Sequence, residues 1–471
     1  MVISTLTNSI TRCVSAIKDT VSAPFTDTVI RLGVTGLSRA GKTVFITSLV
    51  ANLLNRGRMP QFNAAASGRI QAIYLQPQPD DTVPRFNYEN HFAALSGKEP
   101  YWPNGTKRIS ELRLSMRVQP TGVLGSFKGP HTVHLDIVDY PGEWLLDLSL
   151  IDKDFATWSA EVLLRITGRP AASDFEHMLN ACDASTRFDE TQAQALASTF
   201  TAHLYAAHEA GFSDCTPGRF LLPGDLKGSP VLTFSPLPFV DRPGRKSLWR
   251  EFERRFESYK RNVVQPFFRN HFAKIDRQIV LVDVLDAINS GPQAVEDMRR
   301  AMADILGAFR PGSNNFLTQV FQGRRIEKIL FAATKADHLH HEQHPQLTAI
   351  TQALLRDAQD RAEFLGATTH AMSISALRTT VEETRSHNGV ELGVVSGKLL
   401  HSNEQKAFYP GALPIDPTHL LGPARSGTES WLDVDYEVMS FAPVPLSLKP
   451  GDGPPHIRLD RAVQFLLGDK L

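Results

Sequence analysis

The chain has 471 residues, and its 50 Lys and Arg balance 50 Asp and Glu, so the formal net charge at pH 7 is zero. Hydrophobic residues make up 42% and charged residues 21%, which is typical of globular proteins and argues against intrinsic disorder. Because basic residues are not in excess, we do not expect general nucleic-acid binding. Three scattered cysteines argue against a disulfide framework, and no apolar run reaches the roughly 18 residues of a membrane span. We therefore expect a cytoplasmic protein.

Residues 1–27 predict an amphipathic helix that ends before Pro24. Docking of this helix on the protein's own body is the favoured interpretation. The alternative is attachment to the surface of the inner membrane or to a membrane-associated protein partner. Only Arg12 and Lys18 would serve a basic face, which weakens that alternative. The apolar positions that define the helix are Ile3, Leu6, Ile10, Cys13, Val14, Ile17 and Val21.

A phosphate-binding loop follows the first predicted strand. The apolar run 29–34 leads into G-L-S-R-A-G-K-T at positions 36–43, and an apolar-faced helix comes next. This is the strand–loop–helix context that G-x-x-x-x-G-K-[ST] requires, with backbone N–H groups directed at phosphates. Lys42 is expected to bridge the β- and γ-phosphates, and Thr43 to hold Mg²⁺. The residues expected to contact nucleotide here are Ser38, Arg39, Ala40, Gly41, Lys42, Thr43 and Val44.

A second motif, D-x-x-G, ends the strand predicted over 133–137. Asp139 is expected to reach the Mg²⁺ shell, and the N–H of Gly142 to meet the γ-phosphate. Alone this motif is weak, because many turns have the same pattern.

Two later segments predict which base is bound. The apolar run 329–332 leads into T-K-A-D, in which the Asp337 carboxylate can accept both the N1–H and N2–H₂ of guanine. Adenine lacks this pair of donors, so the carboxylate selects guanine. Lys335 can lay its methylene stem along the base. A further strand ends in S-I-S-A-L, whose residues Ser375, Ala376 and Leu377 can offer a backbone N–H to guanine O6. An ATPase with an accidental T-K-x-D remains an alternative.

The four motifs in this order resemble the translation-factor-like GTPases. G-L-S-R-A-G-K-T-V-F-I-T-S-L-V, the Y-W-P segment at 101–103 and D-Y-P-G-E-W-L resemble, more narrowly, the YcjX-like family of bacterial stress-associated P-loop GTPases, over about residues 28–470. The resemblance implies an α/β P-loop NTPase domain of the Ras-like type, with a mainly parallel sheet, a large helical insertion and a small β-rich C-terminal extension. It implies GTP/GDP and Mg²⁺ as ligands, and GTP hydrolysis as a slow regulatory switch in bacterial stress response. The alternative is a non-hydrolysing scaffold that recruits a partner through the insertion.

Three residues acquire hypothetical roles from this resemblance. Ras-like proteins have Gln after the D-x-x-G glycine to orient the attacking water; this chain has Glu143, which either orients that water or caps the next helix. Thr106 is expected as a second Mg²⁺ ligand, with Thr82 and Thr121 as rivals. Guanylate-binding and atlastin-like GTPases have Arg at the loop position of Arg39, where it reaches the phosphates when two nucleotide domains meet. This suggests a homodimer through the GTPase domain; the alternative is an Arg39 that faces solvent or pairs with an acid of the insertion.

The motif positions predict the domain organisation. The long interval between D-x-x-G and T-K-x-D exceeds one strand–helix–strand unit, and the next strand of the nucleotide domain is expected over Gln278–Asp283. The predicted parts are 1–27, an amphipathic helix; 28–142 and 277–378, the two halves of the GTPase domain; 143–276, the helical insertion; 379–455, a β-rich extension; and 456–471, a helix that packs on the GTPase domain.

Within these parts, helices are expected over Leu145–Leu164, Ser173–Asn180 and Thr191–Glu209, and strands over Val390–Leu400 and Leu432–Met439. A further helix carries an aromatic stripe beside arginines, which favours the core of the insertion over an RNA-stacking surface. The stripe consists of Trp249, Phe252, Phe256, Tyr259 and Val263. A histidine cluster after Asp337 favours a solvated loop over a metal site. Its members are His338, His340, His341 and His344.

Overall fold

The computed structural model describes residues 27–37, 39–105, 108–121, 129–307, 326–364, 366–426 and 437–471. Most of the predicted N-terminal helix, together with Ser38 and Thr106, lies outside these residues. Among the described helices, none has the length and apolar character needed to cross a membrane.

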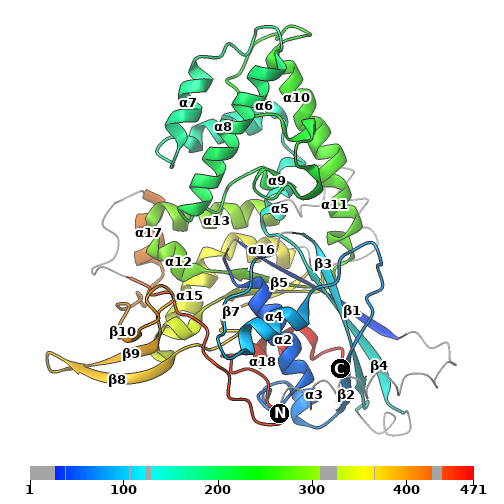
Figure 1. Ribbon diagram of the computed structural model, residues 1–471, viewed down its shortest axis with the longest axis vertical. Helices are drawn as coiled ribbons and strands as arrows, with labels where there is room; N and C mark the ends of the chain where they lie inside the picture. The colour runs from blue at the N-terminus through cyan, green and yellow to red at the C-terminus, as the bar shows by residue number, and fades with distance from the viewer. Residues whose placement is uncertain are drawn as a thin grey trace.

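A seven-stranded sheet forms the centre of the molecule, with the strand order β2-β3-β4-β1-β5-β6-β7 (Figure 1). The strands β4, β1, β5, β6 and β7 are mutually parallel, whereas β3 runs antiparallel to both of its neighbours. The predicted α/β fold with a mainly parallel sheet is therefore confirmed. The strands are β1 (Thr28–Gly36), β2 (Ile70–Gln76), β3 (Ser110–Val118), β4 (His131–Asp139), β5 (Arg277–Val282), β6 (Lys328–Ala333) and β7 (Thr368–Ser373).

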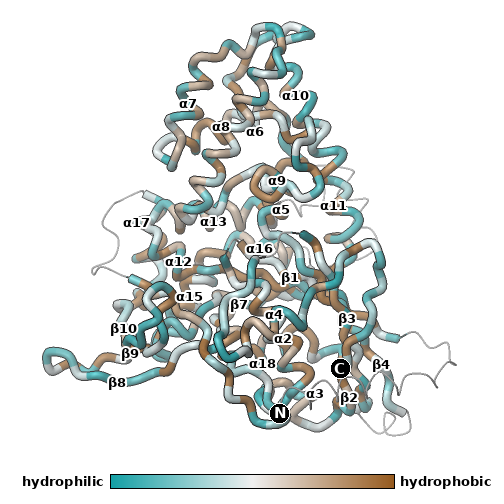
Figure 2. Tube along the Cα trace, in the orientation of Figure 1, coloured by the Kyte–Doolittle hydropathy of each residue, from teal (hydrophilic) through white to brown (hydrophobic). Residues whose placement is uncertain are grey.

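Helices cover both faces of this sheet. Alternate residues of a strand point to opposite faces, so in β5 Ile279 and Leu281 join one hydrophobic cluster while Val280 and Val282 join the other. Hydrophobic residues concentrate along these central strands (Figure 2). The first cluster includes α2 (Lys42–Leu54) and α18 (Leu459–Leu467). The second includes α12 (Val284–Asn289), α13 (Pro292–Gly307), α15 (His344–Leu354) and α16 (Arg356–Phe364).

The chain between β4 and β5 is helical and stands above one edge of the sheet in Figure 1. The aromatic stripe of α10 is buried there, from Trp249 at 5% exposed to Tyr259 at 0%, so its interpretation as a helical core is confirmed. The helices of this segment are α5 (Glu143–Leu146), α6 (Phe155–Ile166), α7 (Ala172–Asn180), α8 (Glu190–Glu209), α9 (Gly218–Leu221), α10 (Leu248–Tyr259) and α11 (Gln265–Asn270).

The expectation of one continuous helix over Leu145–Leu164 is wrong. After α5 the chain forms a 3-10 turn over Asp147–Leu150, and α6 begins only at Phe155. Asp154 caps α6 by accepting a hydrogen bond from the N–H of Thr157 at 2.8 Å. The buried Asp147 bonds to residues distant in sequence, so tertiary contacts determine the break.

A small antiparallel sheet follows β7, with the order β10-β9-β8. Its strands are β8 (Val381–His387), β9 (Val390–Lys398) and β10 (Gln405–Phe408), and β8 is mainly hydrophilic (Figure 2). Asn388 and Gly389 both have positive φ, which is the type I′ geometry of a tight hairpin. Of the strand predicted over Leu432–Met439, residues 432–436 lie outside the described chain, and 437–439 do not form a strand. Three further helices are α3 (Asn63–Ala66), α4 (Tyr88–Ser96) and α17 (Thr418–Ser426).

Candidate nucleotide-binding site

Four sequence motifs meet at one edge of the central sheet. The phosphate-binding loop follows β1, D-x-x-G follows β4, T-K-x-D follows β6 and S-A-L follows β7. These strands are parallel and, with β5 between β1 and β6, form a continuous part of the sheet. Because the carboxyl ends of parallel strands share an edge, segments more than 200 residues apart in sequence come together.

The loop between β1 and α2 has the conformation of an anion cradle. Arg39 and Gly41 have φ values of 58° and 80°, and α2 begins at Lys42 with no acidic residue in its first turn. Backbone N–H groups at such a loop and helix start attract phosphate. Ala40 is fully buried beneath the loop, and Val44 is half-buried in the first turn of α2.

Lys42 is held at the base of this loop. Its ammonium donates a hydrogen bond to the carbonyl oxygen of Gly36 at 2.8 Å, and the residue is only 8% exposed. The side chain therefore folds back over the loop and keeps its charge beside the expected phosphate position.

The two oxygen donors predicted to hold magnesium lie in the first turn of α2 and at the end of β4. Thr43 is in the first turn of α2, and its hydroxyl donates to the carbonyl oxygen of Asn104 at 3.4 Å. Asp139 ends β4 and is paired in register with Val34 of β1. Hydroxyl and carboxylate oxygens suit Mg²⁺. The rival Thr82 instead bonds to the carboxylate of Asp80.

The D-x-x-G segment packs directly against the phosphate loop. A Cβ atom at Gly142 would lie 1.8 Å from the carbonyl oxygen of Gly36, so only glycine fits. The next residue, Glu143, begins α5, and its carboxylate lies 3.7 Å from Nε2 of His208 in α8. Burial raises the pKa of Glu143, but the nearby His208 imidazole and the Lys42 charge outweigh burial and leave this pKa below its usual value.

Arg39 pairs with the helical segment. Its guanidinium lies 2.8 Å from the carboxylate of Glu209, the last residue of α8, and both side chains are more than half exposed. This matches the alternative in which Arg39 meets an acid of the helical segment. An exposed pair of this kind contributes about 0–1 kcal/mol, so it is easily broken.

The T-K-x-D segment is fixed by two contacts from the segments that follow β5 and β7. Lys335 has a φ of 58°, and its ammonium pairs with the carboxylate of Asp283, which caps α12. Burial lowers the pKa of Lys335, but the neighbouring Asp283 outweighs it and raises this pKa overall. The buried Asp337 accepts hydrogen bonds at Oδ2 from both the N–H and the hydroxyl of Thr379, each at 2.9 Å. Both side chains are therefore held at the end of β6.

The S-A-L loop is tied to a distant part of the chain. Ser375 and Ile457 exchange backbone hydrogen bonds at 3.0 and 2.8 Å, and the Ser375 hydroxyl donates to the Leu377 carbonyl oxygen. The Ser375 N–H is therefore already used. The N–H of Ala376 has no acceptor within the described part of the chain, so it is the better candidate to meet guanine O6.

Sequence reasoning missed three residues of this region: His208, Asp283 and Thr379. Thr379 lies two residues beyond S-A-L, and a hydroxyl so close to the loop could have been proposed as a partner of Asp337. Asp283 was recognised only as a strand end. His208 comes from α8, and no local pattern indicates that it reaches Glu143.

The histidine cluster is not a solvated loop. His338, His340 and His344 are buried, and only His341 is exposed. The expectation of solvation is wrong because later segments of the chain cover them: the ring of His338 packs on Phe441 at 5.0 Å.

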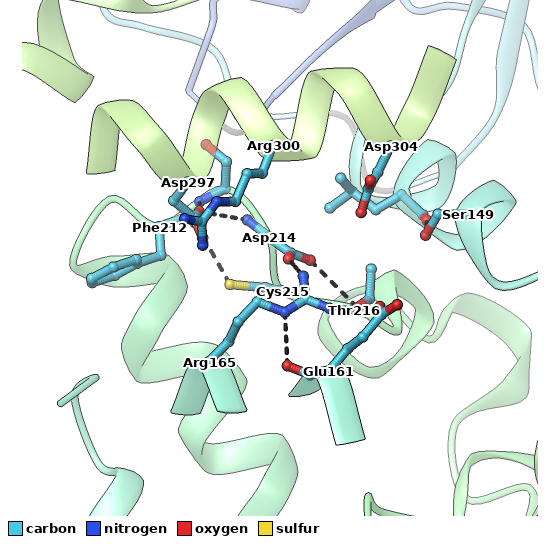
Figure 3. Close-up of polar contacts among 12 residues, drawn as sticks. Ser149, Glu161, Arg165, Phe212, Asp214, Cys215, Thr216, Asp297, Arg300 and Asp304 are labelled. Atoms are coloured by element: carbon cyan, nitrogen blue, oxygen red, sulfur yellow. Dashed lines mark hydrogen bonds and ion pairs between the residues drawn. The ribbon is translucent and has the colours of Figure 1, made fainter. Parts of the chain in front are cut away.

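An ionic network joins the helical segment to α13 (Figure 3). Asp297 of α13 accepts hydrogen bonds from the N–H groups of Ser213 and Asp214 at 2.6 and 2.8 Å. The Asp214 carboxylate pairs in turn with Arg165 of α6. Since residues 211–217 directly follow α8, this network fixes the end of α8 that carries His208.

A second buried carboxylate, Asp147, makes stability depend on pH. It accepts hydrogen bonds from the Tyr259 hydroxyl and from the Gly218 N–H, the latter at 2.7 Å. Burial raises the pKa of Asp147 to about 6, which these bonds only partly offset. The folded chain therefore retains a proton that the unfolded chain releases, and stability falls as pH rises from about 4 through 6, by about 3 kcal/mol.

Replacing this residue, Asp147→Asn, is expected to remove that loss, because the amide stays neutral and can keep both partners. Urea unfolding at pH 4.5 and 7 should show that the variant gains stability over the parent as pH rises. Asp154→Asn is the control, since burial at Asp154 is slight and the Thr157 hydrogen bonds lower its pKa, which gives the opposite sign. Identical pH profiles for parent and Asp147→Asn would contradict the prediction.

Comparisons with known proteins show the family of this chain. Residues 30–471 match the YcjX-like family, DUF463. A protein of Escherichia coli (strain K12) named Ras-like GTPase YcjX is 37% identical over 460 residues, which cover 94% of this chain and 96% of that protein. A protein of the same name from Shewanella oneidensis is 35% identical over 471 residues, covering 94% and 95%. The chain therefore belongs to the YcjX-like family.

Proposed function

We propose that the protein binds GTP and GDP with Mg²⁺ and hydrolyses GTP to GDP and phosphate as a slow regulatory switch. One observation carries the proposal: the phosphate loop, D-x-x-G, T-K-x-D and S-A-L segments converge at the carboxyl edge of β4, β1, β6 and β7. The name Ras-like GTPase of two relatives supports the same activity. In this proposal the helical segment is the surface that binds a partner, because its α8 ends beside the phosphate loop.

Each residue of the site has a defined task in this proposal. Lys42 exchanges its bond to the Gly36 carbonyl oxygen for the β- and γ-phosphates. Thr43 and Asp139 would hold Mg²⁺, which when bound offsets the charge of the transferring phosphoryl group. Asp337, held by Thr379, accepts the two donors of guanine. The Lys335 ammonium bonds to Asp283, which leaves its methylene stem to pack on the base.

Glu143 leaves a second function open, that of a GTP-dependent scaffold with negligible turnover. Its lowered pKa keeps the side chain ionised at neutral pH, and a carboxylate beside the phosphate loop repels the γ-phosphate. As a base, Glu143 would accept a proton from the attacking water, while His208 orients the Glu143 carboxylate. Ionisation therefore favours either a very slow hydrolase or a scaffold.

Two experiments test the proposal. Competition binding with guanine and adenine nucleotides comes first: displacement by GTP and GDP but not by ATP supports the guanine assignment, and equal displacement by ATP contradicts it. Single-turnover hydrolysis then separates the enzyme from the scaffold. It should be run with the purified chain alone and again with cell lysate or membranes, since a partner that supplies a missing group would raise only the second rate.

The Arg39 hypothesis makes a joint prediction. If a second copy draws Arg39 onto the phosphates, turnover per molecule rises with protein concentration, and Arg39→Ala flattens that rise while GTP affinity barely changes. Such arginines contribute about 10³–10⁵ in turnover. Glu209→Ala is the matched control, because it frees Arg39 from its present partner and should keep the concentration dependence. Turnover of the parent that does not vary with concentration would leave Arg39 as a partner of Glu209 only.

A further inference from the structure

Three side chains with metal-binding atoms converge beside the base-reading segment. His340 and His341 lie in the loop between β6 and α15, and Glu382 is on β8 of the small sheet. One atom of each lies within 4.8 Å of the others. Oε2 of Glu382 is 2.6 Å from Nδ1 of His341 and 4.0 Å from Nε2 of His340.

We propose that His340, His341 and Glu382 bind Zn²⁺. Zinc bonds of about 2.0–2.1 Å in tetrahedral geometry separate two ligand atoms by about 3.4 Å, a value between the two observed separations. The His341–Glu382 contact would lengthen and the His340–Glu382 contact would shorten, each by less than about 1 Å. Two imidazoles and one carboxylate form a set of nitrogen and oxygen donors suited to zinc, and three protein ligands leave the fourth position for water.

The surroundings of His340 favour this role. Its other ring nitrogen, Nδ1, lies 3.3 Å from the carboxylate of Glu342. Nδ1 makes no hydrogen bond within the described chain, so this carboxylate is free to accept its proton when an ion binds, which would direct the free electron pair of Nε2 toward the metal. The ring also packs closely against β9, where a Cβ atom at Gly393 would be 2.7 Å from it. Glycine therefore permits the packing that fixes this imidazole.

The other two ligands are positioned and accessible. Arg378 approaches Oε1 of Glu382 at 3.4 Å, which directs Oε2 toward the histidines. The side chains of His341 and Glu382 are 63% and 21% exposed, so an ion can enter from solvent. The ring centroids of His340 and His341 lie 4.3 Å apart, so the two imidazoles are direct neighbours.

The site would link the two segments that hold Asp337. His340 and His341 follow Asp337 along the chain, while Glu382 follows Thr379 and its hydrogen bonds to the Asp337 carboxylate. A bound ion would therefore clamp these segments to each other. Metal binding itself depends only on the three ligands, so its test is independent of the nucleotide proposal.

The test uses the full chain without a polyhistidine tag, stripped of metal with EDTA and dialysed. Zn²⁺ is titrated in competition with a chromophoric chelator, and Co²⁺ is added separately to record the visible absorption of a tetrahedral site. We expect one Zn²⁺ per chain, with affinity lowered at least tenfold in His341→Ala and in Glu382→Gln. Glu342→Gln should weaken binding about 10-fold while keeping all three ligands, which is typical of the loss of an outer carboxylate.

His387→Ala is the matched control, since this histidine is exposed at the far end of β8. It should bind Zn²⁺ as the parent does. Because the His341 side chain is largely exposed, His341→Ala is expected to fold, and circular dichroism checks this. A parent without tight one-to-one binding overturns the proposal, as does equal affinity in His341→Ala and the parent, or an equal loss in His387→Ala.

Discussion

Replacing Lys42 with alanine is expected to lower GTP affinity at least 100-fold, which corresponds to about 2.7 kcal/mol. The ammonium is held at the base of the described loop, and Arg39, the other cation of this loop, pairs with Glu209. Hydrogen bonds from a cation to phosphate are among the strongest in proteins, so no neighbouring side chain replaces them. Isothermal titration calorimetry with GTP and with GDP measures the loss.

Thr43→Ala is expected to affect nucleotide binding differently from Lys42→Ala. It removes a proposed magnesium ligand, so it should lower GTP affinity only when Mg²⁺ is present and should leave some affinity for GDP. Lys42→Ala should instead weaken binding with and without the metal. If both variants bind and hydrolyse GTP as the parent does, the nucleotide site lies elsewhere in the chain. Thermal unfolding of each variant checks that the fold is retained.

Changing Asp337 to asparagine is expected to exchange guanine for xanthine. The amide has one acceptor where the carboxylate had two, so GTP affinity should fall by about 1–3 kcal/mol, the usual cost of an unpaired buried polar group. The structure strengthens the second half of this prediction. Thr379 donates twice to one oxygen, so the amide oxygen will take that place and the NH₂ group will face the base. Xanthine nucleotides, which carry a carbonyl at C2, should therefore gain affinity.

Thr379→Ala is the control for base choice. It leaves the carboxylate in place but removes the hydroxyl that orients it, so GTP should bind more weakly with no gain for xanthine nucleotides. Competition of labelled GTP with unlabelled GTP, xanthosine triphosphate and ATP measures all three proteins. GTP affinity that is unchanged in Asp337→Asn would remove the guanine assignment.

The central strands were the most predictable part of this protein. Buried parallel strands have near-continuous apolar sequences, so the runs that became β1, β5 and β6 were recognisable, and nucleotide-binding motifs marked the ends of β1 and β6. The aromatic stripe of α10 was equally clear, because its spacing matches a helix that buries one face.

Contacts between distant segments could not be predicted from local pattern. The helix expected over Leu145–Leu164 breaks because Asp147 bonds to Tyr259, which lies 112 residues later. The histidines after Asp337 are buried because β9 and Phe441 cover them. His208 reaches Glu143 only because α8 ends beside the phosphate loop. In each case the surroundings of the side chain are determined by a residue that is distant in sequence.

The contacts of α18 set an order for folding during protein synthesis. Arg277 of β5 is fully buried, at 0% exposed. Its guanidinium donates a hydrogen bond to the Leu466 carbonyl oxygen and pairs with the Asp469 carboxylate. Ile457 completes the S-A-L loop through Ser375. A ribosome that has translated through Thr379 has thus made every nucleotide-site motif and also Glu327, which pairs with Arg277. The nascent chain still lacks the Leu466 carbonyl oxygen and the Asp469 carboxylate, the other partners of this buried guanidinium. Because a buried charge that lacks some of its partners is destabilising, and because the S-A-L loop still lacks Ile457, we expect the nucleotide site to mature only after residues 457–469 leave the exit tunnel.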